Sequence, residues 1–217
     1  MSKHDFSAMR AAMVDSQLRT NEVSEPRIVA ALNAVPRENF VPPDRAALAY
    51  VDVPIPLGQG RSLNAPLVTA RLLVEAQLRP GEKVLLIGSA TGYAAALIAA
   101  LGNEVVAVEE DTRLIAIADA ALGQNSLVTQ ITAPLSQGAA AGAPYEVLFI
   151  DGGVESVSQP LIDQLAEKAR VVTALVDNGV TRLSVGQKAG GTLTLVPVAD
   201  LEATILPGFS KHARFTF

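Results

Sequence analysis

A glycine turn and a later acid are the residues whose types and spacing first suggest chemistry. The stretch VLLIGSATGY places Gly88 and Gly92 directly after an apolar run, and glycines there let the backbone approach a ligand closely. Glu109 ends the next apolar run, roughly 20 residues later, where an acid commonly binds ribose hydroxyls. The pattern predicts a nucleotide-type cofactor site, although Ala90 stands where such turns usually have their middle glycine.

Composition excludes several other kinds of site. The 217 residues include no cysteine, which rules out a disulfide framework, a cysteine-ligated metal and a cysteine nucleophile. The two histidines, His4 and His212, lie near opposite ends, which argues against a histidine relay or a zinc site. A net charge of −5 without a run of Lys or Arg argues against nucleic acid and anionic membranes as partners. With no signal core and no apolar run of spanning length, we expect a soluble, cytoplasmic protein.

The elements that must position the glycine turn alternate along the chain from Gly81 onward. Strands are predicted at 83–88, 104–109, 128–132, 146–150 and 170–176, with helices at about 92–101, 111–122 and 157–169. Alternating units of this kind predict a parallel sheet with helices on both faces. Two alternating runs around Gly190-Gly191 predict an antiparallel hairpin, and the tail 208–217 is expected to dock as an edge strand. The predicted fold class is therefore α/β and Rossmann-like: a largely parallel sheet ending in a hairpin, as in methyltransferases.

The first part of the chain differs in character, with helical and proline-rich stretches. Ser24, followed two residues later by a proline, predicts the N-cap of one helix. Asn64 predicts the N-cap of another helix, running over about 66–78. We expect residues 1–80 to pack on a core formed by residues 81–217, so that the two make one structural unit.

The predicted ligand crevice lies beyond the carboxyl ends of the strands. That edge should gather the glycine turn, Glu109, the loop TAPLSQG and the sequence IDGG that contains Asp151. The third fingerprint glycine of a dehydrogenase would align near Tyr93, so a methyltransferase is favoured over a dehydrogenase.

Four stretches, in order, resemble the protein-L-isoaspartate O-methyltransferase family. They are MVDSQLR, AVPRENFVPPDRAALAYVDVPIPLGQG, LRPGEKVLLIGSATGY and APYEVLFIDGGVESVSQPLIDQL, and together they extend over nearly the whole chain. The resemblance implies methyl transfer from S-adenosylmethionine to the carboxylate of L-isoaspartyl or D-aspartyl residues in damaged proteins. The implied partners are therefore isoaspartyl peptides or proteins. A carboxylate with a pKa near ~4 is already ionised at neutral pH, so the chemistry needs no catalytic histidine.

The resemblance also implies which residues form the site. The implied cofactor set is Gly88, Ser89, Gly92 and Tyr93 on the methionine side, Glu109 at the ribose, and Asp151 at the mouth of the crevice. Asn64 and Ser62 are expected to face the substrate, with Asn64 standing where the family has a serine. An asparagine can still donate a hydrogen bond to a carboxylate. The neighbouring Arg61 either meets a substrate carboxylate or is a solvated loop residue, the latter being the commoner case.

Three positions depart from the family pattern on the cofactor side. Leu86 and Ala133 stand where the family has acids, and Ala90 replaces a glycine. Each lost polar contact would be worth about 1.5–3 kcal/mol, so losing both would weaken cofactor binding by roughly two or more powers of ten. An alternative therefore stays open: a catalytically weak or inactive relative that senses a ligand or binds a partner.

A second alternative is a metal-dependent small-molecule O-methyltransferase. Asp151 after one strand and Asp177-Asn178 after the next resemble the metal triad of catechol-type enzymes, whose oxygen ligands suit Mg²⁺ or Ca²⁺. Asp and Asn beside glycine are also ordinary turn residues, so no metal ligands are assigned.

Overall fold

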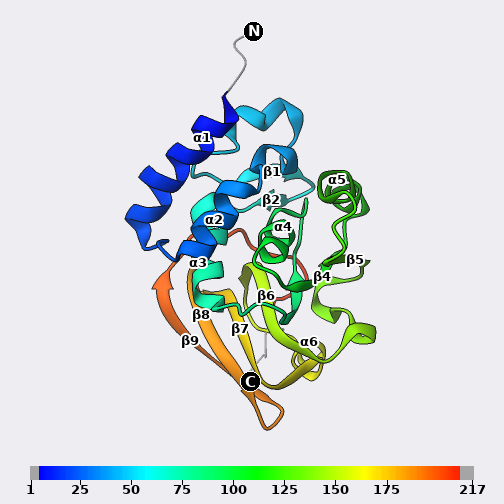
Figure 1. Cartoon of the computed structure of the whole chain (residues 1–217). Coiled ribbons are helices and arrows are strands. Elements are labelled where there is room, and N and C mark those ends of the chain that lie inside the picture. Colours follow the sequence, from blue (N-terminus) through cyan, green and yellow to red (C-terminus); the bar gives the residue numbers. More distant parts are fainter. Residues whose placement is uncertain (1–4, 211–217) are drawn as a thin grey trace.

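A seven-stranded sheet in the order β5-β4-β3-β6-β7-β8-β9 forms the centre of the computed structural model, which describes residues 5–210 (Figure 1). Its strands are β3 (Lys83–Ile87), β4 (Glu104–Glu109), β5 (Val128–Thr132), β6 (Tyr145–Val154), β7 (Leu165–Asp177), β8 (Val180–Ala189) and β9 (Thr192–Asp200). Strands β3 to β7 pair in parallel, whereas β8 and β9 pair antiparallel. The hairpin turn lies at Gly190-Gly191, as predicted. This arrangement confirms the predicted α/β fold class.

Within residues 5–210, six α-helices and several short helical segments surround this sheet. The helices are α1 (Phe6–Met13), α2 (Pro26–Ala34), α3 (Pro66–Ala76), α4 (Tyr93–Ala100), α5 (Thr112–Leu122) and α6 (Gln159–Asp163). Single 3-10 turns lie at Arg19–Asn21, Arg37–Phe40, Pro43–Leu48, Leu135–Gln137 and Ala140–Gly142, and a π-helical turn at Val14–Leu18 extends α1. Strands β1 (Ile55–Gly58) and β2 (Arg61–Leu63) form a separate antiparallel pair. In the described part of the chain, no helix combines the length and apolar character needed to cross a membrane.

The central strands of the sheet are buried on both faces, and β3 shows how. Val84 and Leu86 pack into one apolar cluster with residues of α2, α3 and α4. Leu85 and Ile87 point to the opposite face and pack into a second cluster with residues of α6. Leu206 and Phe209 also belong to this second cluster. A C-terminal segment, residues 201–209, therefore covers part of the face that α6 leaves open; we call it the C-terminal strap.

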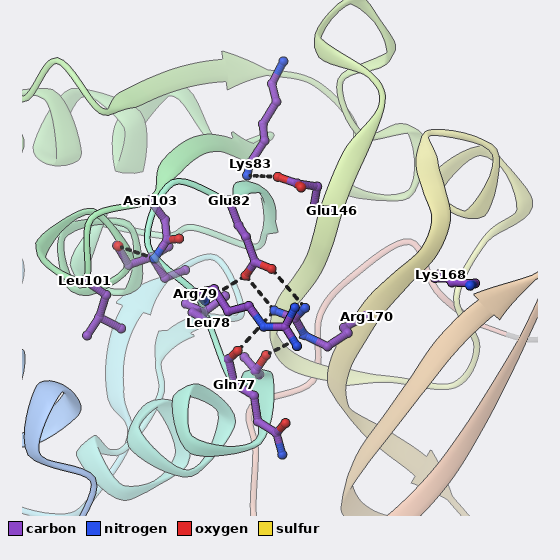
Figure 2. Close-up of polar contacts among 12 residues, drawn as sticks. Gln77, Leu78, Arg79, Glu82, Lys83, Leu101, Asn103, Glu146, Lys168 and Arg170 are labelled. Carbon is purple, nitrogen blue, oxygen red and sulfur yellow. Dashed lines mark hydrogen bonds and ion pairs between the residues drawn. The ribbon is translucent and has the colours of Figure 1, made fainter.

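At the amino end of the parallel strands, Arg170 of β7 joins the end of α3 and the residue before β3 to the sheet. Arg170 of β7 donates to both carboxylate oxygens of Glu82 at 3.0 and 2.6 Å. The same guanidinium donates to the carbonyls of Ala76, the last residue of α3, and of Gln77, which follows it. Figure 2 shows Arg170 between Glu82 and Gln77. Because Gln77 leaves the helix with a positive φ of 47°, the carbonyls at this helix end need such a partner. The end of the sheet opposite the predicted crevice is thus fixed by side-chain bonds.

The predicted helix 157–169 is wrong in its second half. Helix α6 ends at Asp163, and β7 begins at Leu165, which pairs with Tyr145 of β6. Lys168 has a φ of 65°, which a right-handed helix excludes. The buried Leu165 is used by the sheet, so strand pairing overrides the helical pattern of the sequence.

Both predicted side-chain caps are also wrong. Glu25 caps α2, accepting from the N–H groups of Arg27 and Ile28, and Ser24 lies outside the helix. The residue before α3 is Ala65, which cannot cap the helix through its side chain, and the amide of Asn64 has other partners, described below. The N–H of Leu67, in the first turn, donates instead to Oδ1 of Asp52 at 3.0 Å. Of the predicted C-terminal edge strand, residues 208–210 are not in a strand, and residues 211–217 lie outside the described residues.

The Glu25 cap generates a test with a neighbouring control. Replacing it (Glu25→Ala) leaves two N–H groups of α2 without their partner and should lower the free energy of unfolding by about 1 kcal/mol. Ser24→Ala should change it by less than about 0.5 kcal/mol. Urea denaturation of both variants measures the difference, and a larger loss in Ser24→Ala would contradict the cap assignment.

Candidate cofactor and substrate site

The glycine turn has the predicted form, with positive φ at three residues. Gly88 and Gly92 have φ values of 75° and 92°, and Ala90 adopts 48° although it carries a side chain. The N–H groups of Gly88 and Ser89 both donate to the carbonyl of Val108 on β4. A Cβ on Gly92 would lie 3.0 Å from the Cβ of Ala118, so this glycine permits close packing against α5. The strand–turn–helix shape therefore survives the alanine at position 90.

The predicted ribose acid, Glu109, is fully buried and already saturated with hydrogen bonds. Arg61 of β2 binds it with two parallel bonds, Nη1 to Oε1 at 2.7 Å and Nη2 to Oε2 at 2.8 Å. The N–H groups of Ala90, Glu110 and Asp111 donate to the same carboxylate at 2.9 to 3.1 Å. A carboxylate offers about four acceptor positions, and here five donors share them. Arg61, only 6% exposed, is thus neither a solvated loop residue nor free for a substrate carboxylate.

The predicted substrate-facing residue Asn64 is buried and fully bonded. Its Nδ2 donates to the carbonyl oxygen and to Oδ1 of Asp151, both at 2.9 Å. Its Oδ1 accepts from the N–H and the hydroxyl of Thr204, both at 2.8 Å. Thr69 of α3 adds a bond to Asp151 Oδ1 at 3.1 Å. Asn64 therefore connects the entry to α3, the end of β6 and the C-terminal strap.

Burial controls the charge of Asp151. Desolvation raises the pKa of this carboxyl above its ordinary value of 3.8. The hydrogen bonds from Asn64 and Thr69 act in the opposite direction, as do the charges of Arg37 and Arg61, without reversing the shift. In the folded protein this group therefore binds a proton more readily than in the unfolded chain.

A buried guanidinium, Arg37, lies under Asn64. It is fully buried, donates from Nη2 to the carbonyl of Asn64 at 2.6 Å, and lies 4.7 Å from the ring centroid of Tyr93. Its other two nitrogens, the hydroxyl of Ser89 and the hydroxyl of Tyr93 have no hydrogen-bond partner among the described residues. Sequence reasoning did not single out Arg37, although it lies in the VPR of a stretch that resembles the family.

Leu206 occupies the space directly beyond the glycine turn. A Cβ placed on Gly88 would lie 2.7 Å from its Cδ1, and one placed on Gly152 would lie 2.6 Å from its Cγ. Gly88 directly follows β3, and Gly152 lies within β6, the neighbouring strand at the centre of the sheet. The absence of side chains there allows close approach, and the group that approaches is a side chain of the same protein. No motif in the sequence pointed to Leu206.

Two further features border this region. Ser62 lies between Arg61 and Leu63 on β2, and strand alternation places it on the opposite face from the arginine that binds Glu109. A hollow of about 440 Å³ opens beside the Arg61–Glu109 pair, lined by Gln59, Arg61, Glu110, Asp111, Thr112, Arg113 and Pro207.

The three residues of the metal alternative lie in unlike surroundings. Asp151 is buried and bonded to Asn64 and Thr69, whereas Asp177 has a 67% exposed side chain that pairs with Arg182. Asn178 is an exposed turn residue with a φ of 49°. Among residues 5–210, no group of three or more acids or histidines is arranged to hold a metal ion.

As placed, these residues do not fit S-adenosylmethionine. The acid expected at the ribose is saturated by Arg61 and backbone groups, and Leu206 fills the space against Gly88. Leu86 packs with the helices of one core cluster and Ala133 against the other, so neither position offers a polar contact. The backbone of the crevice has the form expected of the family, but Arg61 and Leu206 occupy the positions expected for the cofactor.

The Arg61–Glu109 pair should contribute strongly to stability because Glu109 is inaccessible to water. Arg61→Gln leaves a buried carboxylate without its counter-charge and should lower the free energy of unfolding by about 3–5 kcal/mol. The matched control is Arg19→Gln. The side chains of Arg19 and its partner Asp15 are both more than half exposed, so this change should lower the free energy of unfolding by less than about 1 kcal/mol. Denaturant titration measures both, and equal losses would contradict the assignment.

The raised pKa of Asp151 predicts a pH dependence of stability. The folded state holds this proton more tightly than the unfolded state, so the group's contribution to stability is present at low pH and is lost as pH rises. Asp151→Asn removes the titration. The unfolding free energy of the wild type minus that of the variant should therefore fall as pH rises from about 4 towards 8. Urea denaturation across that range tests this, and a difference that grows with pH would contradict it.

Comparison with known proteins places the chain in a family. The model of the protein-L-isoaspartate(D-aspartate) O-methyltransferase family matches residues 8–202. A protein-L-isoaspartate O-methyltransferase of Koribacter versatilis is 34% identical over 205 residues, 94% of this chain and 92% of the relative. One of Gloeobacter violaceus is 38% identical over 163 residues, 74% of this chain and 79% of the relative.

Solved structures agree on the fold. A protein-L-isoaspartate O-methyltransferase superposes with a TM-score of 0.78 at 22% identity, covering 94% of this chain and 66% of its own. A second, from Plasmodium falciparum in complex with S-adenosyl-L-homocysteine, gives a TM-score of 0.75 at 14% identity, covering 94% of this chain and 99% of its own. The filled crevice is thus a feature within a shared fold, and this chain belongs to the protein-L-isoaspartate(D-aspartate) O-methyltransferase family.

Proposed function

We propose that this protein transfers a methyl group from S-adenosylmethionine to the carboxylate of L-isoaspartyl residues in damaged proteins. The observation that carries the proposal is the retained link between the glycine turn after β3 and the acid that ends β4. The N–H of Ala90 in the turn donates to Glu109 at 2.9 Å, so the glycine turn and the acid expected at the ribose lie next to each other. Relatives named protein-L-isoaspartate O-methyltransferase, aligned over most of their length, support the same activity.

The roles of single residues are part of this proposal. Gly88, Ser89, Gly92 and Tyr93 would line the methionine side, Glu109 the ribose side and Asp151 the mouth, with Asn64 and Ser62 on the substrate side. Ser62 lies on the face of β2 opposite to Arg61, so of these two residues we favour Asn64 for contact with the substrate. Glu109 and Asn64 could take up their roles only after their present partners, Arg61 and Thr204, have moved.

We also propose that residues 1–80 and 81–217 fold as one unit in the cytoplasm. Support for the single unit comes from one apolar cluster, which contains Met13 and Leu32 of the first part with Val84 and Leu97 of the second. The cytoplasmic location is supported by the absence of cysteine and by a net charge of −5 without a run of Lys or Arg.

A second function is favoured by a specific observation. Glu109 is saturated and Leu206 lies against Gly88, so a member of the family that binds a partner or senses a ligand without turnover is also consistent with the site. This candidate and the methyltransferase differ in whether the protein turns over.

Methyl transfer to a peptide decides between them. With tritium-methyl donor at about millimolar concentration, we expect label in a peptide that contains one isoaspartyl residue. A peptide of the same sequence with an ordinary aspartyl residue is the matched control and should stay unlabelled, since only the linkage at the carboxylate differs. Equal labelling of the two peptides would contradict the substrate assignment, and no labelling of either would favour the non-catalytic candidate.

A further inference from the structure

The C-terminal strap binds the end of β6 as a short added strand would. The N–H of Gly153 donates to the carbonyl of Thr204 at 2.7 Å, and the N–H of Leu206 donates back to the carbonyl of Gly153 at 2.9 Å. Ile205 forms a parallel bridge with Gly153 between these two bonds. Main-chain pairing of this kind fixes which strap side chain points into the protein.

Side chains from two other segments hold the strap in the same register. Oδ1 of Asn64, two residues before α3, accepts hydrogen bonds from the N–H and the hydroxyl of Thr204. Thr181 of β8 accepts from the N–H of Ala203 through its hydroxyl at 3.1 Å and from the N–H of Leu201 through its carbonyl at 3.2 Å. The strap is thus hydrogen-bonded to the residue that precedes the entry to α3, to β6 and to β8.

Neighbouring strap residues face opposite ways. Leu206 is 5% exposed and lies against Gly88 and Gly152, whereas Ile205 is 59% exposed. Pro207 then lines the hollow beside Arg61 and Glu110. The strap therefore places the side chain of Leu206 in the crevice, and Pro207 continues along the edge of the neighbouring hollow.

The strap and the cofactor would use the same places. Gly88 is a proposed cofactor residue and is the residue that Leu206 covers, and Asn64 is a proposed substrate residue and is the residue that holds Thr204. Two groups cannot occupy one space, so closing the strap and binding the cofactor exclude each other. A ligand that binds only the open form has an apparent affinity reduced by the fraction of molecules that are open.

We propose that the C-terminal strap is an internal competitor of the cofactor, which must leave the crevice before S-adenosylmethionine or S-adenosylhomocysteine can bind. This inference rests on the proposed function. If the strap competes with the cofactor, Leu206 affects cofactor affinity although it contacts no substrate. The structure with Leu206 against Gly88 is then the closed state of the site, and the cofactor binds the open state.

Calorimetric titration with S-adenosylhomocysteine tests the proposal on three forms of the full chain. Leu206→Ala removes most of the side chain that covers Gly88 and should bind about ten-fold more tightly than the wild type or better. Ile205→Ala, the matched control on the same strap, removes an exposed side chain and should bind as the wild type does. Thermal denaturation shows whether each variant is folded.

The outcomes separate the two proposals. If all three forms bind with the same affinity, the strap proposal is overturned and the proposed cofactor use stands. If no folded form binds, the proposed function is wrong and the strap proposal falls with it.

A measurement on the wild type alone guards against misfolding of Leu206→Ala. The amide protons of Gly153 and Leu206 are bonded within the strap pairing and should be protected from hydrogen exchange. Saturating S-adenosylhomocysteine should speed exchange at Leu206 while that of Val105, within the β3–β4–β5 region, stays unchanged. Protection of Leu206 that persists in the saturated protein would mean that strap and cofactor bind together, which overturns the proposal.

Discussion

The buried pair of Arg61 and Glu109 is the interaction on which the rest of the crevice depends. A charge of this kind inside a protein needs a partner and hydrogen bonds for its remaining lone pairs, and Glu109 has both. Because its partner comes from the small β1–β2 pair, the ion pair fixes that pair over the end of β4. The same carboxylate accepts a hydrogen bond from the N–H of Ala90. The side chain of Glu109 therefore positions both the β1–β2 pair and the glycine turn.

The apolar departures from the family pattern agree with this closed arrangement. Leu86 contributes to the cluster beneath the helices, and Ala133 packs against the cluster that also contains Leu206. An acid in place of the fully buried Leu86 would be a buried charge, which is costly unless it is paired. Side-chain bonds join remote segments at both ends of the sheet. At the amino end Arg170 of β7 pairs with Glu82 and binds the end of α3 (Figure 2), and at the carboxyl end Arg61 pairs with Glu109.

Much of the core could be predicted because its elements are set by local pattern. The apolar runs at 104–109 and 128–132 became β4 and β5 at those bounds, and α4 and α5 lie within one residue of prediction. Local pattern failed where a tertiary contact competed with it. The helical periodicity after Asp163 gave way to the pairing of Leu165 with Tyr145, and the capping potential of Asn64 gave way to Asp151 and Thr204.

By itself, the sequence determined the fold class, the family resemblance and the location of the crevice, since these follow from residue types at fixed spacing within short stretches of the chain and from the order of those stretches. It placed Gly88 and Glu109 at the carboxyl edge of adjacent strands, where the structure has them. Only the tertiary structure decided what fills that edge. Arg61 and Glu109 are 48 residues apart, and Asn64 and Thr204 are 140 apart. Contacts over such separations depend on how the whole chain packs, and no local pattern of residues specifies them.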